Sequence, residues 1–209
     1  MRKRTIYTIT GSLLTCGAVL SGQALAQQLP SRDFSYDYVE GGMVFTEYDR
    51  GGIDEEPLGP RLIGSTSLAR NFFVQGEGSY LSDDTDITTL TLGLGYRLAA
   101  TDSVDLYSVA SGAFRNIDPD RESSDHEAGY QLTAGIRHGC IFLDHLAHTW
   151  EIRYLDIDTG KDIDDGIVNL RAKPVYSLTQ RWDAVGELQI EDAADERNLG
   201  LALGARYNF

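Results

Sequence analysis

Hydrophobic and polar residues alternate one by one along much of the chain, most clearly at its end. From Arg197 to Phe209, leucines, Ala205, Tyr207 and Phe209 occupy one set of alternate positions, and small or polar residues occupy the other. Successive side chains of a β-strand point to opposite sides, so this period of two predicts a strand with one apolar face. That face ends in aromatic residues, which are typical of the boundary between a membrane and water.

The same alternation recurs in earlier segments, as in Leu90, Leu92 and Leu94 against Thr91 and Gly93. Turn-forming residues separate these segments from one another. The ten predicted strands cover residues 34–48, 59–69, 72–81, 87–98, 103–115, 127–138, 147–157, 166–176, 182–191 and 197–209.

Two of the predicted strands depart from a regular pattern. Residues 36–42 fit a single phase badly, so we expect Glu40 on the polar face and a β-bulge near Tyr38 and Val39. Pro174 falls on the apolar face of the eighth predicted strand and lacks a backbone N–H, which predicts a local distortion there.

The connections between the predicted strands alternate in charge. Those after the odd-numbered strands are rich in Asp and Glu, and those after the even-numbered strands are nearly free of them. A soluble β-sandwich, the alternative fold, gives no reason for such sorting, whereas an up-and-down barrel places alternate connections on opposite sides of a membrane. The sequence therefore predicts an all-β fold: an antiparallel up-and-down transmembrane β-barrel of ten strands, with eight strands as the alternative.

The first residues have the features of a secretory signal peptide. A basic start at residues 2–4 and an apolar stretch at 6–20 precede Ala24-Leu25-Ala26, which predicts cleavage after Ala26. A lipoprotein with Cys16 as its first residue is less favoured, because Thr15 is a poor residue before a lipidated cysteine. The expected organisation is a cleaved signal peptide at 1–26, a short periplasmic segment at 27–33 and an outer-membrane barrel at 34–209.

Composition narrows the possible functions. The net charge of −14 argues against nucleic-acid binding, which depends on clustered Lys and Arg. No apolar run after the signal peptide approaches the roughly 20 residues of a transmembrane helix. Only Cys140 remains after cleavage, so no intramolecular disulfide is expected.

The chain resembles the small bacterial outer-membrane barrels of the OmpA/OmpX membrane-domain type. Residues 36–42 resemble their first strand and residues 205–209 their last, although this chain is predicted to have ten strands instead of eight. The resemblance implies an outer-membrane location, contact with membrane lipids and lipopolysaccharide, and a monomer. It also implies that the barrel-insertion machinery reads Phe209, Tyr207 and Ala205.

The positions expected to face the lumen carry charges of both signs. Because isolated buried charges are very unfavourable, and barrels of this size are nearly filled by their own side chains, we expect these residues to pair and plug the lumen. A narrow pore for small solutes or ions is the alternative. The expected network consists of Glu40, Arg61, Glu77, Arg97, Arg115, Arg137, Glu151, Arg153, Arg171, Lys173, Glu187 and Arg206.

Two groups of residues suggest metal binding, but neither matches a known site. His138, Cys140, Asp144, His145 and His148 lie around one predicted periplasmic turn without the spacing of a zinc site. Residues 156–165 carry alternating carboxylates but lack the glycine and closing glutamate of an EF-hand. We therefore expect no metal and no other cofactor.

An enzyme is also not expected. An omptin-like protease or a lipid-modifying barrel would need a catalytic group at the outer rim, where Asp125 and His126 are the only such pair. The chain contains neither a G-x-S-x-G nor an H-E-x-x-H motif. The predicted function is a non-enzymatic outer-membrane barrel with an envelope-structural or surface-interaction role.

Overall fold

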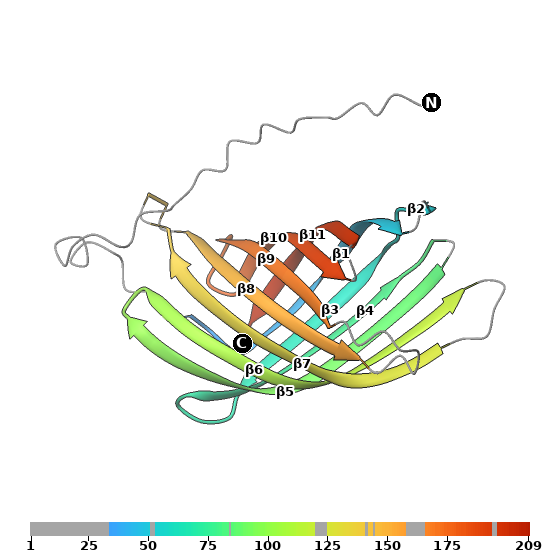
Figure 1. Cartoon of the computed structure of the whole chain (residues 1–209). Helices are drawn as coiled ribbons and strands as arrows, with labels where there is room; N and C mark the ends of the chain where they lie inside the picture. The colour runs from blue at the N-terminus through green and yellow to red at the C-terminus, as the bar shows by residue number, and fades with distance from the viewer. Residues whose placement is uncertain are drawn as a thin grey trace.

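The computed structural model describes residues 34–50, 53–83, 85–119, 125–140, 142–143, 145–157, 166–193 and 196–209. These residues form a closed antiparallel β-barrel (Figure 1). The predicted signal peptide and the segment 27–33 lie outside the described residues. The strands are β1 (Tyr38–Arg50), β2 (Ile53–Glu55), β3 (Leu58–Ser67), β4 (Phe72–Leu81), β5 (Thr85–Thr101), β6 (Val104–Pro119), β7 (Asp125–Gly139), β8 (Leu146–Ile157), β9 (Ile167–Ser177), β10 (Trp182–Ala193) and β11 (Glu196–Asn208).

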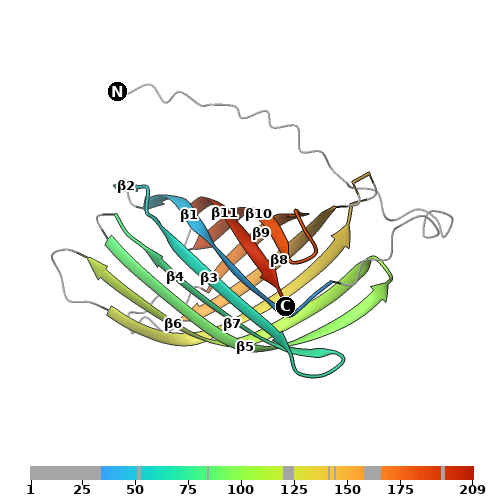
Figure 2. The ribbon, with the colours of Figure 1, turned by 180° about the vertical axis from the view of Figure 1, so that it is seen from behind.

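The wall of the barrel is an up-and-down meander of ten strands. Each strand from β3 to β11 pairs with the next one, and β1 pairs with both β3 and β11. The closing seam runs without interruption from the pair Tyr38 and Asn208 to the pair Glu47 and Leu199. The short β2 pairs only with the end of β1, so it extends one hairpin and is not part of the wall. The predicted ten-stranded barrel is confirmed, and Figure 2 shows the wall from the opposite side.

The outer face of the barrel is a band of apolar side chains. Aromatic pairs lie near its two ends: Phe72 and Tyr96 have ring centroids 5.2 Å apart at one end, and Tyr130 and Tyr154 are 6.3 Å apart at the other. An aliphatic band between two aromatic girdles is the surface that a lipid bilayer requires. The exposed side chains between the girdles include Leu90, Leu92, Leu94, Leu132, Ile152, Leu170, Leu188, Leu201 and Leu203.

The turns show which end of the barrel faces the periplasm. The β3–β4 turn is closed by the N–H groups of Leu68 and Ala69, which both donate to the carbonyl of Phe72, and the β9–β10 turn repeats this arrangement. Such short turns lie on the same side as Asn208, the end of the last strand. In outer-membrane barrels the short turns are periplasmic, so the acidic connections face outward. Within the described residues, no helix is both long and apolar enough to cross a membrane.

The bulge predicted near Tyr38 and Val39 was wrong. Both ladders of β1 keep a constant register there, and Tyr38 and Glu40 share the inner face, with 2% and 3% of their surfaces exposed. The sequence pattern was misleading because a lumenal aromatic residue looks like a lipid-facing one. Within the described strands, the register shift lies instead between Ala99 and Thr101.

Pro174 interrupts one ladder, as its missing N–H predicts. It faces outward, and the pairs of β9 with β10 skip Lys173 and Pro174 while the register on both sides is unchanged. At the closing seam, Gly42 lies opposite Gly204, and a Cβ atom on either would come within 2.5 Å of a backbone oxygen. This close approach of β1 and β11 therefore requires glycine at both positions.

The lipid-facing band can be tested with a charge at two depths. Leu92 lies near the middle of β5 and is 66% exposed. Replacing Leu92 by Arg should destabilise the barrel folded in lipid vesicles by about 2–4 kcal/mol, because the guanidinium loses its hydration at the bilayer centre. Leu98→Arg, beside the periplasmic interface, should cost about 0–1 kcal/mol in the same urea titrations. Equal losses at the two positions would contradict this placement of the bilayer.

Candidate functional site

The centre of the lumen is built around the carboxylate of Glu187, which is 2% exposed on β10. Arg61 of β3 binds it with two donors: Nη1 lies 2.6 Å from Oε1 and Nη2 lies 2.9 Å from Oε2. Lys173 Nζ lies 3.2 Å from Oε2, and Arg171 Nη1 lies 3.6 Å from Oε1. One buried carboxylate therefore joins cations from two other strands.

A second carboxylate, that of Glu40 on β1, extends the cluster towards the periplasm. It accepts hydrogen bonds from Lys173 Nζ at 3.0 Å and from Arg206 Nη2 at 2.6 Å. Lys173 thus bridges Glu40 and Glu187 across the lumen. The guanidinium of Arg206 also lies 4.1 Å from the ring centre of Tyr38, which provides a cation–π contact.

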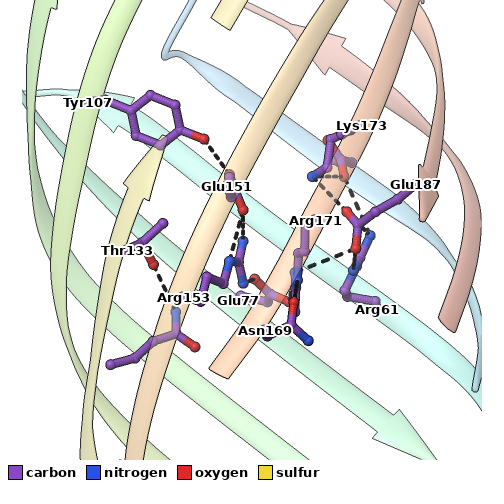
Figure 3. Close-up of polar contacts among 12 residues, drawn as sticks. Arg61, Glu77, Tyr107, Thr133, Glu151, Arg153, Asn169, Arg171, Lys173 and Glu187 are labelled. Atoms are coloured by element: carbon purple, nitrogen blue, oxygen red, sulfur yellow. Dashed lines mark hydrogen bonds and ion pairs between the residues drawn. The ribbon is translucent and has the colours of Figure 1, made fainter. Parts of the chain in front are cut away.

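The cluster continues across the barrel through Glu77 on β4. Its two oxygens accept hydrogen bonds from Arg153 at 2.7 Å and Arg171 at 3.1 Å. Arg153 also lies 2.6 Å from Glu151, which accepts a very short hydrogen bond from the hydroxyl of Tyr107. Figure 3 shows this line of contacts from Tyr107 to Lys173. Charged side chains from seven strands are therefore held in one connected network, here called the central ion network.

An aromatic layer lies in the lumen on the periplasmic side of this network. Tyr36, just before β1, is 1% exposed and packs on Phe73 with ring centroids 4.6 Å apart. The guanidinium of Arg137 lies 4.3 Å from the ring centre of Tyr36 and 5.0 Å from that of Tyr107. Phe73 in turn lies over Gly95, where a Cβ atom would be 2.2 Å from the ring. We call Tyr36, Phe73, Tyr107 and Arg137 the aromatic plug.

The segment that carries Tyr36 is fastened to the barrel wall. Asp37 accepts hydrogen bonds from the backbone N–H of Ser67 at 2.6 Å and from the hydroxyl of Thr66 at 3.1 Å. These hydrogen bonds lower the pKa of the Asp37 carboxyl, and the one from the backbone of Ser67 has the largest effect. Arg97 and Arg137 also donate to the carbonyls of Phe34 and Ser35. The segment before β1 is therefore held at the periplasmic mouth.

The outer half of the lumen is open. A cavity of about 80 Å³ extends from the outer mouth down to the central ion network. Hydroxyl and amide groups line its sides, and Val44, Leu81 and Ile87 form an apolar patch on the wall. The charged residues of its lining are Arg61, Glu77, Arg115, Arg153, Arg171 and Glu191. We call this cavity the outer well.

All twelve residues of the expected lumen set face the interior, but they do not form one network. Eight are buried: Arg137 belongs to the aromatic plug, and the other seven form the central ion network together with Glu77 and Arg171, which are 10% and 12% exposed. Arg97 lies at the periplasmic mouth near Asp105, and Arg115 lines the outer well. The predicted set did not contain the buried tyrosines Tyr36, Tyr38 and Tyr107 or the buried carboxylates Asp105, Glu127 and Asp183. The available signal was the alternation in β6, which places Tyr107 on the same face as the charged Asp105. Both residues are buried in the structure.

Those residues considered for metal binding that the structure describes do not gather into a metal site. His138 and His148 stack with ring centroids 5.4 Å apart, and Trp150 Nε1 donates to His138. Cys140 is buried, and the ring of His145 lies against Tyr176 instead. No three His, Cys, Asp or Glu side chains within the described part of the chain are close enough to hold a metal ion.

Other candidates fall partly outside the described residues. Asp144 and most of the acidic loop, residues 158–165, lie outside them. Asp125 and His126 begin β7, where His126 pairs with Asn116. This position is near the outer rim, as the sequence predicts.

The central ion network can be tested by removing one charge. Glu187→Gln leaves Arg61 and Lys173 without a full counter-charge in a buried site, so the free energy of unfolding should fall by about 3–5 kcal/mol. Urea titration of the refolded barrel measures this loss. Glu47→Gln, which makes the same change at an exposed position, should have almost no effect. A Glu187→Gln protein as stable as the parent would contradict the structural role of the network.

The Asp37 contacts predict a dependence on pH. A lowered pKa in the folded protein stabilises it above the unfolded pKa, and this contribution is lost as the pH falls through the folded pKa. The stability difference between the parent and Asp37→Asn should therefore be largest near neutral pH and should shrink below about pH 4. Urea midpoints measured across this range test the prediction, with Glu47→Gln as the control. A difference that stays constant down to about pH 2 would show that Asp37 does not act through its charge.

Comparison with known proteins places this geometry in a family. The sequence profile of the outer membrane protein beta-barrel domain matches residues 12–174, which is more than half of the chain. A search of the curated proteins gave no significant match.

Three solved structures illustrate the similarity. Neisserial surface protein A (NspA) is 11% identical, with 84% of this chain and 98% of that chain covered and a TM-score of 0.45. The attachment invasion locus protein Ail of Yersinia pestis is 12% identical, covering 82% and 97%, with a TM-score of 0.39. The N-terminal β-barrel domain of Pseudomonas aeruginosa OprF is 15% identical, covering 83% and 98%, also at 0.39. These similarities are too low to transfer a function, and it is the profile match that assigns the chain: it belongs to the outer membrane protein beta-barrel domain family and is located in the bacterial outer membrane.

Proposed function

We propose that this protein is a closed, non-enzymatic outer-membrane barrel that serves the envelope structurally and presents its acidic connections at the surface. The observation that carries the proposal is the continuous set of contacts across the lumen. The central ion network links β3, β4 and β8 to β10 with β1 and β11, and the aromatic plug lies beneath it. Two different kinds of packing therefore obstruct the same path.

The bonds in the network favour a permanent closure over a gate. Arg61 holds Glu187 with two parallel hydrogen bonds, and Glu77 receives one arginine on each oxygen. Removing one partner from such a buried arrangement is strongly unfavourable. A gate that opened by moving a single side chain would have to leave a charge unpaired.

A narrow pore is the second candidate, and the outer well favours it. The lining of the well reaches the central ion network, so the network and the aromatic plug lie between the well and the periplasm. Opening would require both layers to move together.

We also propose that Phe209, Tyr207 and Ala205 guide insertion of a monomeric barrel. Phe209 is 65% exposed at the end of the chain, where its N–H donates to the carbonyl of Asp37. Ala205 is exposed on the same outer face, and the hydroxyl of Tyr207 accepts a hydrogen bond from Arg181. The three residues are thus available on the lipid-facing edge of the final strand.

Recording in planar lipid bilayers tests the closure. The parent protein should give no steady single-channel current, whereas Tyr36→Ala combined with Arg137→Ala and Arg153→Ala should conduct, because both obstructing layers lose bulk. A control triple variant at lipid-facing positions, Leu94→Ala, Leu132→Ala and Ile152→Ala, should stay silent. Heat-modifiable migration on gels verifies that each barrel is folded. Steady channels in the parent protein would favour the pore instead.

A further inference from the structure

The outer well has the chemistry of a ligand site, although closure of the lumen does not require one. Its side walls carry the hydroxyls of Ser79, Thr89 and Thr91, and amides from Gln131, Asn169 and Gln189. Hydroxyls and amides both donate and accept hydrogen bonds, which is the property that a hydroxylated solute needs from its site. Strands β1 and β3 to β10 all contribute to the lining, so the well is a built cavity inside the barrel.

Cations outnumber carboxylates in the lining of the well, where Arg61, Arg115, Arg153 and Arg171 face Glu77 and Glu191. The central ion network joins five cations (Arg61, Arg153, Arg171, Lys173 and Arg206) with four carboxylates (Glu40, Glu77, Glu151 and Glu187). Because a charge that is shielded from water needs a partner, this surplus favours an anion on the open side of the network. Arg61, Arg153 and Arg171 are the cations of the network that line the floor of the well; Figure 3 shows Arg153 and Arg171 beside Glu77, and Arg61 beside Glu187.

Arg115 adds an unsatisfied donor above this floor. Its Nε atom is buried and makes no hydrogen bond within the described residues. Thr89 lies opposite Arg115 on β5, and Glu127 lies opposite it on β7. An unpaired buried donor is unfavourable unless a ligand or water satisfies it.

The rim of the well has the opposite charge. Glu191 lines the well towards the outer end of β10 and accepts a hydrogen bond from Asn169 at 3.3 Å. An acidic rim above a basic floor disfavours anions with several charges. It admits a molecule with a single negative charge at one end and neutral hydroxyls at the other.

We propose that the outer well binds a small hydroxylated monocarboxylate, of the sugar-acid type, from the external medium. The carboxylate takes the donors of Arg115 and of the guanidinium floor, and the hydroxyls take the threonine, serine and amide groups of the walls. The closed network below stops the ligand, so the site is a place of capture and not a passage.

Calorimetric titration of the folded barrel in neutral detergent tests the site, with gluconate as the probe and glucose as its uncharged counterpart. Gluconate should bind saturably and more weakly as chloride is added, and glucose should bind far more weakly. Arg115→Gln should weaken gluconate binding about tenfold, the effect of losing one charge-assisted hydrogen bond. Arg70→Gln, the same change on an exposed periplasmic turn, should leave the affinity unchanged.

A second variant covers the case in which Arg115→Gln does not fold. Thr89→Val keeps the shape of the wall and removes one hydroxyl, so it should also weaken gluconate binding. The proposal is overturned if gluconate gives no saturable heat, if glucose binds equally well, or if the folded Arg115→Gln or Thr89→Val protein keeps the parent affinity. A conductance measurement tests the closure separately, because a closed lumen does not depend on an occupied well.

Discussion

The interior of this barrel depends on one constraint: charges placed in a narrow lumen must be paired. Glu187, Glu40, Glu77 and Glu151 each bind at least one cation, and Arg61, Arg153 and Arg171 each serve two carboxylates. The pairs join strands that are far apart in the sequence, such as β3 with β10. The network therefore stabilises the closed shape of the wall.

The aromatic plug surrounds a buried guanidinium at the periplasmic mouth. Arg137 is buried, and three tyrosine rings surround it instead of a directly bound carboxylate. Cation–π contacts and the carbonyl of Ser35 replace the water that this guanidinium loses. Because Tyr36 precedes β1, the fit of the plug depends on the short segment before the barrel, and the Asp37 contacts hold that segment in place.

The lumen is therefore asymmetric. Its periplasmic half is filled by rings and ion pairs, whereas its outer half keeps polar walls and space for solvent. A barrel used only as a scaffold could fill both halves in the same way. The open outer half is the feature on which the proposed binding of a small anion rests, in addition to the structural role of the barrel.

The sequence by itself determined the wall of this protein. A period of two places Leu92, Leu132 and Leu170 on one face and charges on the other, and this rule is local because neighbouring strand residues always point to opposite sides. It also identified twelve of the charged residues that face inward, although not Asp105, Glu127 or Glu191. Only the tertiary structure decided which of them meet, because contacts such as Arg61 with Glu187 depend on the register and closure of the whole barrel. The same closure put Tyr36, Tyr38 and Tyr107 inside, where local hydrophobicity cannot distinguish a lumenal ring beside an arginine from a ring in lipid.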